Sequence, residues 1–339
     1  LFLVLAIMAV YYFRERSLFL DTAFQSFEII KNGGFAIQVN RFGAVFAQAF
    51  PLLALKLGLP LKGVLIAWSL SFVLVHWALF SLALHRLRQP AFALCIALFN
   101  IILVNHSFYW VQNEGVQAVS WCLFFWALLA HCEAKGKWTA GNVLTAAGLV
   151  PLLVFFHPLV VFPFFFTAFF FSFGKMAGGN NPDSPKLSYK TLLLSVAAFL
   201  LVLASKQLFF NNHYDQLADK RLTLNRLWEF LDNPIHQAGT RLFWEHLPTD
   251  FYLWPPALLL VVIFYLRQKS RLKLLLVTGA HLAGWVLVTT AYQEGGHFFH
   301  IETQYLPLSI FVLLPLCVDV LPALFTRGKW LLPAALLLG

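Results

Sequence analysis

The chain has 339 residues, a net charge of +9 and a mean hydropathy of +0.74. Sixty per cent of its residues are hydrophobic and 12% are charged, whereas a soluble domain has roughly 45–50% apolar and about 25% charged residues. This composition excludes a soluble globular protein, a disordered chain and a conventional nucleic-acid-binding protein. The four cysteines lie in or beside apolar segments, without a spacing typical of disulfides or zinc.

The apolar segments predict an all-α, polytopic membrane protein with about eleven transmembrane helices. A helix needs roughly 20 apolar residues to cross a hydrocarbon core of about 30 Å. Because the first and last apolar segments are cut by the chain ends, we expect a longer polypeptide, of which 1–339 is a single transmembrane domain. The predicted spans are 1–13, 62–85, 91–105, 114–132, 139–157, 159–173, 190–207, 251–267, 273–292, 305–325 and 329–339.

Lysine and arginine concentrate in alternate short connections between the predicted spans. Because positive charge favours cytoplasmic loops, we expect these connections in the cytoplasm and the two long ones, 14–61 and 208–250, on the extracytoplasmic face. The basic connections hold thirteen Lys and Arg against two acids, and the other face holds eleven against twelve. The net charge therefore indicates topology and not an acidic partner such as nucleic acid.

Acidic and histidine side chains gather on the predicted extracytoplasmic face. In a polytopic protein, function usually lies where polar groups cluster against apolar surroundings. We therefore expect any site on this face of a multi-pass membrane protein. The residues are Asp21, Glu28, His106, Glu114, His157, Glu294, His297, His300 and Glu302.

Residues 19–35 predict an amphipathic helix in the first long connection. An apolar stripe opposite a polar stripe is typical of a helix that lies in the membrane interface. Gly33 and Gly34 predict its C-cap. The apolar stripe contains Leu20, Phe24, Phe27 and Ile30, and the polar stripe contains Asp21, Gln25 and Glu28. On spacing alone, an N-terminal acid favoured by the helix dipole and a solvated glutamate explain Asp21 and Glu28 equally well.

The eight residues from Asp21 to Glu28 resemble the D-E-x-[FW]-Q-x-x-E segment in the first luminal loop of GT-C glycosyltransferases. The pattern is most similar to the mannosyltransferases of GPI-anchor and N-glycan assembly. Those multi-span enzymes take a sugar from a polyprenyl-phosphate carrier and act on the outer or luminal face. The resemblance implies that Asp21 is the catalytic carboxylate and that 14–61 holds paired juxtamembrane helices. Thr22 stands where the family has a second acid, which leaves a metal role open.

Two other segments are similar to the wider superfamily. Glu114 matches by position an acid in the second outer loop of many bacterial members, where it could bind a metal or orient the acceptor. A glutamate at a helix N-terminus explains Glu114 equally well. Residues 305–308 resemble a YLPL segment before a late span, with Glu302 nearby and without the arginine common there.

Sugar transfer from a lipid phosphate requires a base for the acceptor hydroxyl, positive groups or a metal for the departing phosphate, and an apolar groove for the tail. The resemblance implies Asp21 as the base, inversion at the anomeric carbon, and a divalent metal (Mg or Mn) as a possible cofactor. The implied partners are the lipid bilayer, a polyprenyl-phosphate-linked sugar and a glycan, lipid or protein acceptor. Candidate substrate-binding residues are Gln25, Glu28, Arg41, His106, Lys206, Lys220, Arg221, His297, His300 and Glu302. Topology or snorkelling also explains each basic residue among them.

The alternative is a non-catalytic scaffold subunit, working with membrane partner subunits, or a transporter built on the same fold. Transporters typically have polar or broken helices near the bilayer midplane, at corresponding positions of two related halves of the chain. This sequence has few charges near the midplane and no two matching halves. Trp228 in the second long connection predicts either sugar stacking or the anchor of an interfacial helix around 223–232.

Overall fold

The structure is a computed structural model, and the residues that it describes are predominantly helical. They are 1–102, 104, 106–109, 114–176, 185, 187–210, 212, 221–293, 302 and 304–324. No strand occurs within these ranges, so the prediction of an all-α protein is confirmed for them.

The described elements are α-helices joined by short turns of 3-10 or π-helix. The α-helices are α1 (Phe2–Tyr11), α2 (Phe13–Ser17), α3 (Leu20–Asn32), α4 (Val45–Lys56), α5 (Leu61–Ser81), α6 (Pro90–Phe99), α7 (Glu114–Lys135), α8 (Ala140–Val154), α9 (Val161–Met176), α10 (Tyr189–Phe209), α12 (Leu224–Asp232), α13 (Ala238–His246), α14 (Trp254–Arg267), α15 (Arg271–Ala291), α17 (Ile310–Pro315) and α18 (Leu321–Leu324). The short turns are η1 (Phe42–Ala44), η2 (Leu82–Arg86), η3 (His106–Tyr109), η4 (Pro158–Val160), η5 (Leu306–Ser309) and η6 (Leu316–Val320).

Five helical segments of the described chain are long and apolar enough to cross a membrane. They are Leu61–Arg86, Glu114–Lys135, Tyr189–Phe209, Arg271–Ala291 and Leu306–Leu324. Five other predicted spans correspond to the shorter apolar helices α1, α6, α8, α9 and α14, and 329–339 lies outside the described residues. The chain is therefore a multi-pass helical membrane protein, and eleven complete crossings stay a prediction.

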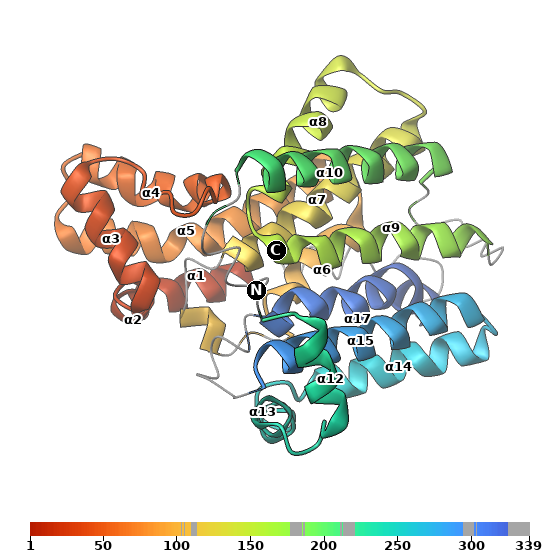
Figure 1. Cartoon of the computed structure of the whole chain (residues 1–339). Coiled ribbons are helices and arrows are strands. Elements are labelled where there is room, and N and C mark those ends of the chain that lie inside the picture. Colours follow the sequence, from red (N-terminus) through yellow and green to blue (C-terminus); the bar gives the residue numbers. More distant parts are fainter. Residues whose placement is uncertain are drawn as a thin grey trace.

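The long helices α9, α10, α14 and α15 run roughly alongside one another, and α3 and α4 project from one end of the assembly (Figure 1). Helix α7 is central, because 83% of its apolar stretch is buried, against 22% for α10. Helix α10 therefore lies at the periphery, where its exposed leucines face lipid.

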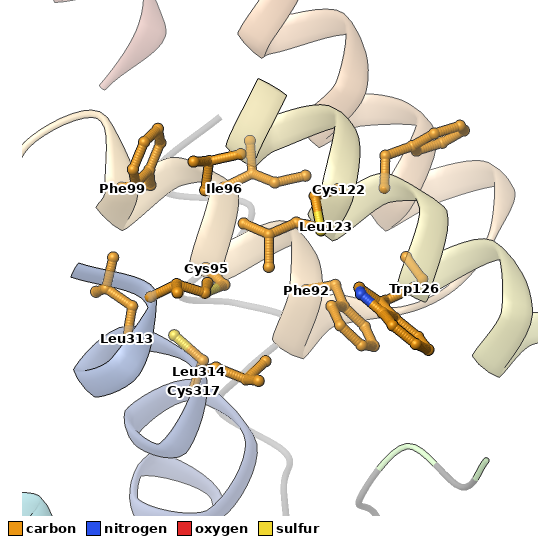
Figure 2. Packing of buried hydrophobic residues seen from close by; sticks show 14 of the residues in the cluster. Phe92, Cys95, Ile96, Phe99, Cys122, Leu123, Trp126, Leu313, Leu314 and Cys317 are labelled. Carbon is orange, nitrogen blue, oxygen red and sulfur yellow. The ribbon is translucent and has the colours of Figure 1, made fainter. Parts of the chain in front are cut away.

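The core is built where α6 packs between α7 and α17. Figure 2 shows the side chains of all three helices meeting there, with Cys95 beside Cys317. All four cysteines are free and buried. Small residues such as Ala93 and Ala97, both fully buried, let the helices approach closely. Close approach matters because helix association within lipid depends on packing.

The acid in the tenth predicted span is satisfied by an ion pair. Lys273 Nζ lies 2.5 Å from Asp319 Oδ2, and the Tyr265 hydroxyl donates to the same oxygen at 2.7 Å. Ionisable groups inside a membrane are expensive unless paired. The contacts of Asp319 with Lys273 and Tyr265 therefore join η6 to α15 and α14. They give a structural reason for an acid within this predicted span.

Gly43 of η1 packs against Phe156, which lies between α8 and η4. This contact predicts that no side chain larger than that of glycine fits at position 43. A Cβ there would lie 2.2 Å from the Phe156 ring, and Phe156 is fully buried. We expect Gly43→Ala to lower the free energy of unfolding by about 1–3 kcal/mol, as overpacking does. Gly148→Ala is the control, because a Cβ at Gly148 meets open space. Thermal unfolding in detergent measures both, and an equal effect of the two substitutions would contradict this packing.

Candidate functional site

The buried face of helix α3 is mostly polar, and its aromatic side chains are exposed. Gln25 is 2% exposed, whereas Phe24 and Phe27 are 53% and 58% exposed. The helix ends at Gly33, which adopts φ +61° and donates its N–H to the Ile29 carbonyl, so the predicted C-cap is confirmed. An outward aromatic face is favourable next to an apolar medium, as for a helix in a membrane interface.

Gln48 of α4 holds Gln25 in a defined orientation. The Gln48 side-chain amide donates to Gln25 Oε1 at 2.8 Å and to the Ala36 carbonyl at 3.1 Å. Its own oxygen accepts from the Ala36 N–H at 2.8 Å. Because Gln25 Oε1 is an acceptor here, its Nε2 is the atom of this side chain that can donate a hydrogen bond.

Four predicted site residues meet around the first residue of α7. Glu114 is 7% exposed, and its Oε2 lies 3.4 Å from Arg41 Nη1. Gln25 and Asp21 both lie within electrostatic range of this carboxylate. We call Asp21, Gln25, Arg41 and Glu114 the Glu114 cluster. The fold therefore places Asp21, the acid that the resemblance implies as catalytic, within electrostatic range of Glu114.

Strained backbone precedes both Asp21 and Arg41 of the cluster. Leu20, directly before Asp21, has φ +42°, and Val39 and Asn40, directly before Arg41, have φ +44° and +60°. Positive φ is costly for leucine and for β-branched valine, and such strain is often found at functional sites. Asn40 Nδ2 holds this segment by donating to the Phe210 carbonyl at 3.0 Å.

Two further basic residues lie beside Arg41. Lys206 is 4% exposed, and its Nζ donates to the Val154 carbonyl at 3.3 Å. Burial, together with the charges of Arg41 and Lys206, holds the pKa of His157 well below its usual range. His157 is therefore neutral at pH 7, and its Nδ1 accepts from the Leu159 N–H at 3.2 Å. The remaining Nε2 then carries the hydrogen and is a donor. We call Arg41, His157 and Lys206 the basic trio.

A buried arginine supports the connection that leads to Glu114. Arg16 is fully buried, and its guanidinium donates to Ser69 Oγ at 2.9 Å and to the Ser69 carbonyl at 3.0 Å. A third donor reaches the Phe108 carbonyl of η3, and the guanidinium lies 4.0 Å from the Phe108 ring centroid. Arg16 thereby fixes η3 against α2 and α5.

The other predicted binding residues have different surroundings. Glu28 accepts from Asn32 Nδ2 at 2.7 Å within α3, and the exposed Arg221 lies 5.6 Å from the Tyr292 ring. Glu302 is fully buried. Lys220, His297, His300 and the side chain of His106 lie outside the described residues.

The sequence did not single out Gln48, and it placed His157 on the extracytoplasmic face without making it a candidate substrate-binding residue. A glutamine within an apolar stretch and a histidine before a proline at the end of a predicted span were the available signals. Each is equally typical of a solvated residue or of a helix boundary, so neither signal was decisive.

The described residues do not fit the divalent metal that the resemblance implies. Mg²⁺ prefers an octahedral set of oxygen ligands, and the Glu114 carboxylate contacts the Arg41 guanidinium instead. Within the described ranges, no three His, Cys, Asp or Glu side chains form a ligand group. We derive no chemical step through a metal.

Comparison of the chain with protein-family models, with curated proteins and with solved structures gives no match. We therefore infer the function from the Glu114 cluster, the basic trio and the sequence pattern around Asp21.

The Arg41–Glu114 ion pair predicts that substitutions of these two residues have non-additive effects on the free energy of unfolding. Their side chains are only 17% and 10% exposed, so Arg41→Met leaves a largely buried carboxylate without this cation. We expect Arg41→Met to lower the free energy of unfolding by about 2 kcal/mol, which lies between the losses measured for exposed and for fully buried ion pairs. Adding Glu114→Gln to Arg41→Met should recover most of the loss. A double-mutant cycle of thermal unfolding measures this, and strictly additive effects would argue against the pair.

The lowered pKa of His157 predicts acid sensitivity. An unfolded histidine has a pKa of about 6.5, so below this pH the unfolded chain binds a proton that folded His157 does not take up. Stability should therefore fall between pH 7 and pH 5, and His157→Gln should reduce this loss. His236→Gln, at an exposed position, is the control that keeps the wild-type profile. A His157→Gln profile parallel to that of the wild type would refute the assignment; thermal unfolding across pH provides the data.

Proposed function

We propose that the protein is an inverting glycosyltransferase of the GT-C type. It transfers a sugar from a polyprenyl-phosphate carrier to an acceptor at the extracytoplasmic face, with its basic connections in the cytoplasm and about eleven spans. The observation that carries this proposal is the convergence of Asp21 with the Glu114–Arg41 pair beside two further basic residues.

The two acids are suited to different roles. Asp21 is exposed and accessible to an acceptor, so it is the general base. Glu114 is buried and engaged by Arg41 and Gln25, so it positions Arg41. A base must lie within reach of the proton that it removes, and an exposed acid in the first turn of an interfacial helix would be accessible to a membrane-bound donor and to an acceptor from solution.

The proposed step is a single displacement. The acceptor hydroxyl oxygen forms a bond to the anomeric carbon while Asp21 accepts its proton. The bond between the anomeric carbon and the phosphate oxygen breaks, and its electron pair leaves on polyprenyl phosphate. The configuration at the anomeric carbon inverts. The basic trio would stabilise the negative charge that develops on the phosphate, as preorganised donors do in a site with little water.

The position of Thr22 is compatible with a single acid. Thr22 is fully buried, so a second carboxylate there would need a buried partner. The absence of that acid is also the one feature that favours the alternative, a non-catalytic scaffold with membrane partner subunits. Activity of the wild-type protein separates the two functions.

Asp21→Asn should abolish sugar transfer while the fold and donor binding persist. Loss of a general base lowers the rate by about 10²–10⁴-fold. Asp232→Asn, the same change at an exposed acid of α12, should leave the rate unchanged. The assay is transfer of radiolabelled sugar from a panel of polyprenyl-phosphate sugars in proteoliposomes. Unchanged transfer by Asp21→Asn would refute the catalytic assignment, and a wild type that consumes no donor of the panel would favour the scaffold.

A further inference from the structure

Three exposed basic residues lie in the turn that joins α14 to α15. They are Arg267 at the end of α14, Lys269 in the turn and Arg271 at the start of α15. The sequence contains no acid between Asp250 and Glu294, and none of the three has an ion-pair partner among the described residues. Figure 1 places this turn at the end of the bundle away from α3 and α4, so its positive charge is separate from the Glu114 cluster.

A fourth basic residue next to the turn is neutralised and supports it. Lys273 pairs with Asp319, whose Oδ2 also accepts from the Tyr265 hydroxyl. These contacts hold the last turn of α14 and the first turn of α15 to the same carboxylate. The three exposed cations therefore keep a net charge of +3 on a fixed support.

Lys269 adopts a backbone conformation that favours glycine. Its φ is +54°, its N–H donates to the Leu266 carbonyl at 3.1 Å, and the Ser270 N–H donates to the Tyr265 carbonyl at 3.0 Å. This is the Schellman arrangement, in which glycine usually takes the position of positive φ. The corresponding residues after α3, α4 and α7 are Gly33, Gly58 and Gly136. A lysine at this position has a conformational cost, which indicates that its charge is used.

Exposed leucines flank the three cations. Leu266 and Leu272 are 58% and 37% exposed, and Leu275, one turn further along α15, is 69% exposed. In a membrane-spanning hairpin such side chains face lipid tails, while the basic head groups extend toward water. The turn therefore lies where the phosphates of phospholipids lie. Charge complementarity favours a headgroup with net negative charge, because a zwitterionic headgroup carries a cation of its own.

We propose that the turn between α14 and α15 binds the headgroup of an anionic phospholipid such as phosphatidylglycerol. Arg267, Lys269 and Arg271 donate to the phosphate oxygens, and the lipid tails lie along the exposed leucines of the two helices. A basic residue beside a membrane span attracts anionic lipid by about 1 kcal/mol, which is about fivefold in affinity. This inference does not depend on the proposed sugar transfer. It adds a lipid partner at the other end of the bundle.

The test compares two helix ends that carry the same kinds of residue. Arg86 and Arg88 are exposed at the end of α5 and η2, and Arg88 has φ +55°. Arg86→Gln with Arg88→Gly therefore removes two charges and one positive φ at a residue with a side chain, as Arg267→Gln with Lys269→Gly does at the proposed site. Glycine suits both conformations, so both variants should fold, which thermal unfolding in neutral detergent checks. Binding of phosphatidylglycerol and of phosphatidylcholine to the full chain is measured by native mass spectrometry.

The wild type and the variant with Arg86→Gln and Arg88→Gly should bind phosphatidylglycerol about tenfold more tightly than phosphatidylcholine. Arg267→Gln with Lys269→Gly should reduce this preference to about twofold and keep the affinity for phosphatidylcholine. Equal binding of the two lipids by the wild type would leave the basic residues a role in topology alone. An equal loss in the two variants would show general attraction to charge without a site at this turn. Either result overturns the inference, and neither affects the proposed function, because the readout involves no sugar and no turnover.

Discussion

The contact between Arg41 and Glu114 joins the first long connection to α7, whose apolar stretch is 83% buried. Glu114 begins α7, and Arg41 follows a strained turn that Asn40 fixes to the end of α10. A carboxylate in this position is stable only with a cation or strong donors nearby. The need for this cation places Arg41, and with it η1 and the end of α10, beside the start of α7. The remaining residues of the Glu114 cluster and the basic trio lie around this contact.

Several partly buried charges of the described residues lie in pairs or small groups. Lys273 and Asp319 connect α14, α15 and η6, and Glu133 accepts from Ser188 where α10 begins beside the end of α7. The Glu114 cluster differs from these pairs because His157 and Lys206 lie near its Arg41 and because Asp21 stays exposed. An excess of donors around an accessible acid suits chemistry on an anionic substrate better than structural support alone.

Local sequence signals predicted local structure well. The stripes of 19–35 with Gly33 predicted α3 and its C-cap, and α12, capped by the Thr223 side chain, lies where a helix was expected around 223–232. Tertiary partners could not be predicted in this way. Periodicity defined two stripes on α3, but the medium around the helix decides which one is buried. Asp21 and Glu114 are 93 positions apart, and nothing in their spacing places them together. Gln48 and His157 acquire their roles only through the packing of α4 and η4.

A cryo-EM structure of the protein in nanodiscs with undecaprenyl phosphate tests the proposed site most directly. Phosphate density should lie within hydrogen-bonding distance of Arg41 and Lys206, with room for a sugar between that phosphate and the Asp21 carboxylate. Undecaprenyl phosphate bound only at another end or face of the bundle, or Arg41 and Glu114 held apart, would contradict the proposed site.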